Sequence, residues 1–130
     1  MHTRTVMGGV AAIVCVGALA CGGNGSPTGP GPSGPGPVGA TITITSNGMA
    51  PGSASINAGQ SITLVNNDTR AHQISSNPHP SHTDCAQLNL GTLNPGQSRT
   101  SDAFPSARTC GYHDHNDPNN GLWMGTLTVR

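Results

Sequence analysis

Lysine and glutamate are both absent from this chain of 130 residues, so its few charges come from five Arg and five Asp. The net charge is zero with His neutral. A chain without a basic excess has no electrostatic basis for binding nucleic acid, and we expect no nucleic-acid partner. Aromatic residues are equally scarce, with only Phe104, Tyr112 and Trp123. Any hydrophobic core must therefore be mainly aliphatic.

The missing Lys and Glu are also common helix formers, whereas Thr, Ser, Asn, Gly and Val are plentiful here. This composition favours strands and turns over helices. The length is enough for one domain and too short for two. We therefore expect a single all-β domain.

The first twenty residues have the features of a signal peptide, because Arg4 precedes a short apolar run over residues 6–20. The run is too short for a comfortable transmembrane helix. It ends in Ala20-Cys21-Gly22, which resembles a bacterial lipobox in which Cys21 is lipidated. The sequence thus predicts an exported lipoprotein at the periplasm or cell surface, anchored to the membrane through its N-terminus. Simple secretion and a retained anchor are the alternatives.

After the signal peptide, residues 21–39 consist of the attachment cysteine and a linker made mostly of Gly and Pro. Such a segment has almost nothing apolar to bury and cannot form a core. The folded domain is therefore expected over residues 40–130.

Short alternating segments separated by Gly, Pro and Asn turns fill this domain. They predict strands over 41–45, 53–56, 60–66, a strand carrying His72 and Ile74, and strands over 97–103, 107–112 and 122–130. A turn is expected between Met49 and Gly52, and a long loop over residues 77–90. Seven to eight strands with no helical period indicate an antiparallel β-sandwich. A domain this small gains from a metal ion or a disulfide.

Five histidines after residue 70 are the main chemical signal. Imidazole is a common ligand of copper and zinc. His113 and His115 leave the same side of an extended chain, while two more lie in a loop braced by Pro78 and Pro80. The candidate metal ligands are His72, His79, His82, His113 and His115. We expect copper, with zinc as the second choice.

Two segments resemble the cupredoxin family. Residues 59–68 followed by His72 are similar to its strand, turn and first histidine ligand, and residues 109–113 with 125–129 to its Cys-x-x-His loop and last strand. The resemblance extends over residues 40–130. It implies a Greek-key β-sandwich that holds copper through His72, Cys110 and His113 and transfers electrons.

Two positions depart from that pattern. Trp123 stands where the family has its axial Met, and Met124 shares a strand face with Thr126 instead of with the apolar residues. Cys85 and Cys110 remain after Cys21 is lipidated, and an even pair in an exported protein usually forms a disulfide. Cys110 is thus either half of a disulfide or a thiolate ligand. With the disulfide, the metal site is built from histidines alone.

The predicted function is copper binding in electron transfer or copper carriage. No second group of residues for a substrate is visible, so we expect a binding protein and not an enzyme. The alternatives are a type-2 copper enzyme acting on oxygen species and a metal-free structural or adhesion sandwich. The expected partners are a redox or copper-exchange protein and the membrane, and the chain is expected to be a monomer.

Overall fold

The computed structural model describes residues 34–130, so the predictions for the signal peptide and for Cys21 lie outside it. Within this range the chain forms nine strands and two short 3-10 helices and no α-helix. In chain order these are β1 Val38–Thr45, β2 Gly48–Ala50, β3 Ser53–Ile56, β4 Ser61–Asn66, β5 His72–Ser76, η1 Ala86–Leu88, β6 Gly91–Leu93, β7 Ser98–Thr100, β8 Arg108–Asp114, η2 Gly121–Trp123 and β9 Met124–Val129. The part of the chain seen here contains no helix long and apolar enough to cross a membrane.

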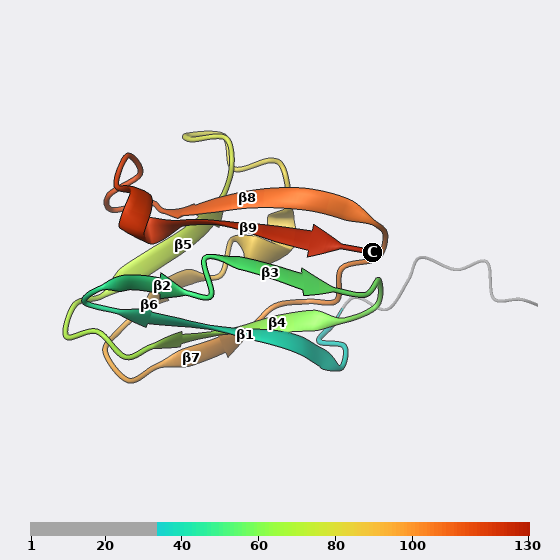
Figure 1. Cartoon of the computed structure of the whole chain (residues 1–130), viewed down its shortest axis with the longest axis horizontal. Coiled ribbons are helices and arrows are strands. Elements are labelled where there is room, and N and C mark those ends of the chain that lie inside the picture. The colour runs from blue at the N-terminus through green and yellow to red at the C-terminus, as the bar shows by residue number, and fades with distance from the viewer. Residues whose placement is uncertain (1–33) are drawn as a thin grey trace, which may run out of the picture.

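The strands form two sheets that pack face to face. One sheet has the order β2-β1-β4-β7 and the other the order β3-β9-β8-β5-β6. Figure 1 shows β8 and β9 in the upper layer and β1, β4 and β7 in the lower one. The prediction of a two-sheet β-sandwich is confirmed. Both sheets are mixed, however, because β1 runs parallel to β4 and β3 runs parallel to β9. The expectation of purely antiparallel pairing is therefore not met.

Two strands were not anticipated from the sequence. β2 occupies part of the segment predicted as a turn, and β6 follows the long loop. Each is only three residues long, and in each case a single neighbouring strand supplies the pairing. Their extended conformation therefore depends on that neighbour and not on an alternating pattern of their own.

The core lies between the sheets and is mainly aliphatic, as the scarcity of aromatics requires. Its fully buried side chains include Ile42, Ile44, Ile62, Leu64, Ile74, Leu88, Leu93, Phe104 and Leu127. The cysteines at positions 85 and 110 are also buried there, and they form a disulfide with a Cα–Cα distance of 5.8 Å. The predicted pair is therefore confirmed. Such a bond indicates an extracellular or periplasmic protein.

Successive residues of β8 face opposite sides of the five-stranded sheet. Cys110 and Tyr112 alternate with Gly111 and His113, and Cys110 pairs with the buried Leu127 of β9. Cys110, Tyr112 and Asp114 therefore face the core, whereas Gly111, His113 and the following His115 face outward. On the neighbouring β5, Ile74 is opposite Asp114 and Ser75 is opposite His113. His72 consequently belongs to the inner face with Ile74.

Candidate metal centre

Four of the five candidate histidines lie together on the outer side of the five-stranded sheet. His79, His82, His113 and His115 each offer one ring nitrogen, and these four nitrogens all lie within 4.8 Å of one another. Ring centroids are 4.8 Å apart for His82 and His115 and 5.0 Å apart for His79 and His115. His79 is exposed, His113 is buried, and the other two are half-buried. One end of the cluster is thus buried in the protein, and the other end is open to solvent.

Two segments far apart in the sequence build the cluster. β8 presents His113 and then His115 on its outer face, as their spacing predicts. The loop after β5 supplies His79 and His82, and Figure 1 shows this loop above the layer of β8 and β9, on the side away from the other sheet. The Cys85–Cys110 disulfide ties the same loop to β8. The loop is therefore fixed by a covalent bond a few residues from its two histidines.

Asn77 joins the loop to the buried ligand of the cluster. Its backbone N–H donates to the carbonyl of Gly111 at 2.9 Å, and its Oδ1 lies 2.7 Å from Nδ1 of His113. A Cβ atom at position 111 would collide with the Asn77 side chain, so a larger residue there would displace that side chain from its present position. Because a carbonyl oxygen only accepts, Nδ1 of His113 carries the proton.

This tautomer leaves Nε2 of His113 with a free lone pair. That atom is buried and has no hydrogen-bond partner among the residues of the structure. Buried polar atoms are almost always satisfied, so an orphaned ring nitrogen that belongs to a four-histidine cluster needs an explanation. A metal ion supplies one, since a ligating His commonly donates its other N–H to a neighbouring oxygen. The residues of this site therefore fit a metal ion.

The backbone of His82 adds a second sign of constraint. His82 has φ of 51°, and it is the one non-glycine residue with positive φ in the described range. Its N–H donates to the carbonyl of Pro78 at 2.7 Å, and its carbonyl accepts from Nδ2 of Asn89 at 2.9 Å. A residue held in this region costs free energy and is often found at functional sites. The loop thus directs the His82 ring into the cluster at some cost in stability.

Electrostatics favour the neutral imidazole at two residues of the cluster, His82 and His113. Burial, followed by the charges that neighbouring histidines would carry, lowers the pKa of His113 and of His82 below the ordinary value. Asp114 opposes this effect at His113, but only as the smallest contribution. Metal ions bind the neutral form of imidazole, so a lowered pKa at these two side chains favours metal binding.

His72, the remaining candidate ligand, is not part of the four-histidine cluster. Its Nδ1 lies 2.7 Å from Oδ2 of Asp114, and its Nε2 lies 2.9 Å from Oδ2 of Asp68. Both ring nitrogens are therefore occupied, and the ring is on the inner face of the sheet that carries the cluster outside. Cys110 is excluded as a thiolate ligand, because its sulfur is in the disulfide. The set of His72, Cys110 and His113 is not brought together.

Other residues of the region take different roles. Asp117 accepts from Nδ2 of Asn120 at 2.8 Å and so stabilises the turn between β8 and η2. Trp123 is buried in the core, and Met124 is partly exposed, as strand parity predicted. Asn77 was not identified from the sequence. Its position just before Pro78 and His79 is the only local signal, and its role depends on contact with the distant Gly111.

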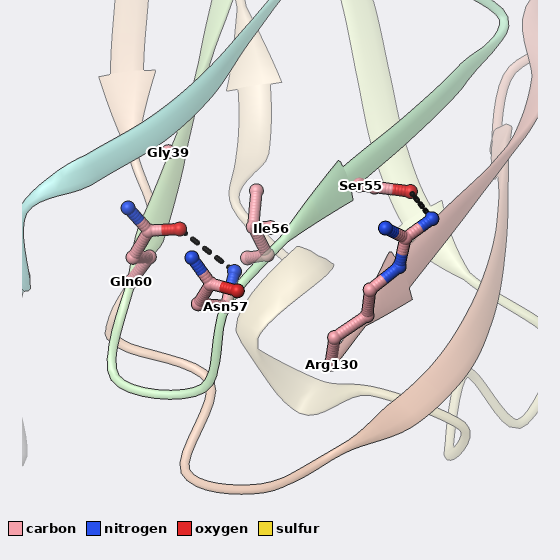
Figure 2. A pocket seen from close by; sticks show the side chains of 6 residues that line it. All are labelled: Gly39, Ser55, Ile56, Asn57, Gln60 and Arg130. Carbon is pink, nitrogen blue, oxygen red and sulfur yellow. Dashed lines mark hydrogen bonds between the residues drawn. The ribbon is translucent and has the colours of Figure 1, made fainter.

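An open pocket of about 330 Å³ lies at the other end of the β8–β9 pair (Figure 2). Arg130 follows β9 there, whereas the histidine cluster adjoins the start of β9. The polar side chains at its rim bond within the protein: Gln60 accepts from the Asn57 N–H at 2.7 Å, and Arg130 reaches Ser55 at 3.5 Å. None of the residues that line this pocket belongs to the histidine cluster.

The fold is that of the cupredoxins. The structure is similar to a purple cupredoxin from Nitrosopumilus maritimus, with a TM-score of 0.58 and 22% identity over 70% of this chain and 99% of that one. It is also similar to auracyanin from Roseiflexus castenholzii, with a TM-score of 0.55 and 17% identity over 73% and 98% of the two chains. Plastocyanin from Dryopteris crassirhizoma gives a TM-score of 0.52 and 16% identity over 69% and 99%.

These low identities establish the fold alone. No protein-family model matches the chain, and no curated protein matches it. The histidine cluster of this cupredoxin-like domain contains no thiolate, because both described cysteines are in the disulfide.

Proposed function

We propose that this domain binds one Cu(II) ion through His79, His82, His113 and His115 and carries copper outside the cytoplasm. The observation that carries the proposal is the convergence of four ring nitrogens within 4.8 Å. Two nitrogens on opposite sides of a bound ion lie about 4 Å apart, so only a small inward movement is needed. Among divalent first-row metals, copper binds nitrogen ligands most tightly.

Carriage accounts for the site better than electron transfer. Blue-copper electron carriers hold the ion with a Cys thiolate and two His, whereas here the only described cysteines are bonded to each other. The exposed His79 leaves an opening through which an ion can be exchanged. The free lone pair of His113 would bind the copper ion, which is the cargo of the domain.

Export is part of the same proposal. The disulfide requires an oxidising compartment, and lipidation at Cys21 followed by the Gly/Pro-rich linker would tether the domain to a membrane. The linker would allow the metal centre to reach a copper-exchange protein nearby.

Competition for the metal tests carriage against electron transfer. Purified domain is loaded with Cu(II), and a chelator of similar affinity is added before and after a cycle of reduction and reoxidation. A carrier transfers its copper to the chelator. Retention of the ion through the redox cycle and against the chelator would instead identify an electron carrier. A domain that binds no copper would leave a structural role for the sandwich.

A further inference from the structure

Between the two outward histidines of β8, Asp114 points into the core. Its Oδ2 is bonded to Nδ1 of His72 at 2.7 Å, and its Oδ1 accepts the backbone N–H groups of Gln73 at 3.1 Å and Asn116 at 3.0 Å. The carboxylate is buried. One side chain thus connects the end of β8 to β5 and to the turn that follows His115.

His72 is held as firmly as the carboxylate that it contacts. Its side chain is 1% exposed, and its other nitrogen is bonded to Asp68 at 2.9 Å. The ring of Trp123 lies against it, with centroids 4.6 Å apart. Arg70 covers that Trp ring at 5.2 Å and pairs with Asp68 at 3.4 Å. The imidazole is fixed at both nitrogens and on one face.

The strand pairing explains why β8 needs this support. Its pairing with β9 ends at His113 opposite Met124, and its pairing with β5 ends at Asp114 opposite Ile74. Beyond that point the N–H of His115 donates to the carbonyl of Gln73 at 2.7 Å. The Asp114 side chain therefore adds its own restraint to the segment that carries the two ligands, at the point where the strand pairing ends.

We propose that His72, acting through Asp114, is a positioning residue of the metal centre. By holding Asp114 inward, it keeps residues 113–115 extended so that both flanking imidazoles face the loop histidines. This inference rests on the proposed metal binding, although the positioning itself is a property of the metal-free protein. Groups that hydrogen-bond directly to a metal ligand typically change metal affinity by about 10–100-fold, and we expect an effect of this order when the backbone of both ligands is released.

The experiment compares His72→Phe with Ile74→Val. Phenylalanine keeps the ring against Trp123 but removes both hydrogen bonds, whereas the valine variant shortens the inner-face residue opposite Asp114 and leaves the network intact. Binding is measured well below the melting temperature of each variant. We expect His72→Phe to weaken Cu(II) binding about 10–100-fold, and Ile74→Val to lower the melting temperature while leaving the affinity within about twofold.

Amide hydrogen exchange of the metal-free protein is the second measurement. The His115 N–H should lose its protection in His72→Phe and keep it in Ile74→Val. If His72→Phe does not fold, Asp114→Ala replaces it, with the same expectations, because alanine offers no hydrogen bond to His72, Gln73 or Asn116. Unchanged His115 protection would overturn the positioning role whether or not copper binds. Wild-type protein that binds no Cu(II) would overturn the proposed function, while the exchange result would still decide the positioning role.

Electron paramagnetic resonance separates positioning from ligation. If His72 is a positioning residue, the copper complex of His72→Phe should still show nitrogen signals from the same four histidines. Its spectrum should be broader, because the ligand geometry is more variable. Loss of one nitrogen ligand in His72→Phe, matching the spectrum of His113→Ala, would make His72 a ligand and would contradict the proposal.

Discussion

Oδ1 of Asn77 lies 2.7 Å from Nδ1 of His113, and this contact connects the loop after β5 to the one buried imidazole of the metal centre. It determines which nitrogen of His113 carries the proton, and so leaves Nε2 free for a metal ion. A single hydrogen bond between two side chains thereby helps to fix the loop relative to β8.

Replacing Asn77 should therefore weaken metal binding. Asn77→Ala removes the acceptor, and we expect Cu(II) affinity to fall about 10–100-fold, as measured by competition with a chelator. Asn77→Asp keeps an acceptor at the same place and should retain most of the affinity. Equal affinity in the alanine variant and the wild type would show that the contact does not serve the site.

The disulfide should stabilise both the domain and the loop that carries two ligands. In the chain-entropy model, a bridge between residues 25 apart contributes about 3–4 kcal/mol. Chemical denaturation of a Cys85→Ala, Cys110→Ala double variant should show a loss of this size, together with weaker Cu(II) binding. The idea is refuted if the double variant is as stable as the wild type. Thiol titration of the unfolded, unreduced domain should find neither cysteine free.

The stability of the metal-free domain should depend on pH through His82 and His113. Both have a lowered pKa, mainly because of burial, so between that pKa and the ordinary 6.5 the folded state binds fewer protons than the unfolded chain. The free energy of unfolding must then rise with pH through this window and level off above it. Asp68, whose pKa is lowered mainly by its hydrogen bond to His72, acts in a separate window below 3.8.

Thermal melting at about pH 5 and about pH 7.5 checks this sign. The metal-free wild type should melt at the higher temperature at the higher pH, and His82→Gln should reduce the difference. A melting temperature that falls as the pH rises over this interval would contradict the assignment of neutral imidazoles.

Much of the fold and part of the site could be predicted from the sequence. Alternating segments gave the main strands, and the spacing of two between His113 and His115 placed both on one face. The ligand pair of Cys110 and His113, which the family resemblance implied, is not formed, because Cys110 is in the disulfide and the two residues lie on opposite faces of β8.

His72 could not be assigned in the same way. Whether it faces the cluster or the core depends on the register of β5 against β8, which the local pattern does not determine. The contact between Asn77 and Gly111 likewise joins positions that only the folded chain brings together. The short strands β2 and β6 were missed for a related reason. Each is extended because it pairs with a neighbouring strand, and that pairing is not visible in the local sequence.

Lipidation at Cys21 remains a prediction from the sequence. Mass spectrometry of protein isolated from membranes should show a diacylglycerol adduct on a mature N-terminus that begins at this cysteine. Cys21→Ser should release the domain from the membrane. A free Cys21 thiol behind an intact N-terminal segment would contradict the prediction.

The nature of the copper complex tests the central claim most directly. Purified domain titrated with Cu(II) should bind one ion per chain, show nitrogen hyperfine structure in its electron paramagnetic resonance spectrum, and have only weak ligand-field absorption. Replacing His79, His82, His113 and His115 together should abolish the signal, whereas Asp102→Asn, a change at an exposed residue outside the cluster, should leave it unaltered. A deep blue complex whose colour disappears in Cys110→Ser would contradict the account, and so would unchanged Cu(II) binding after loss of the four histidines.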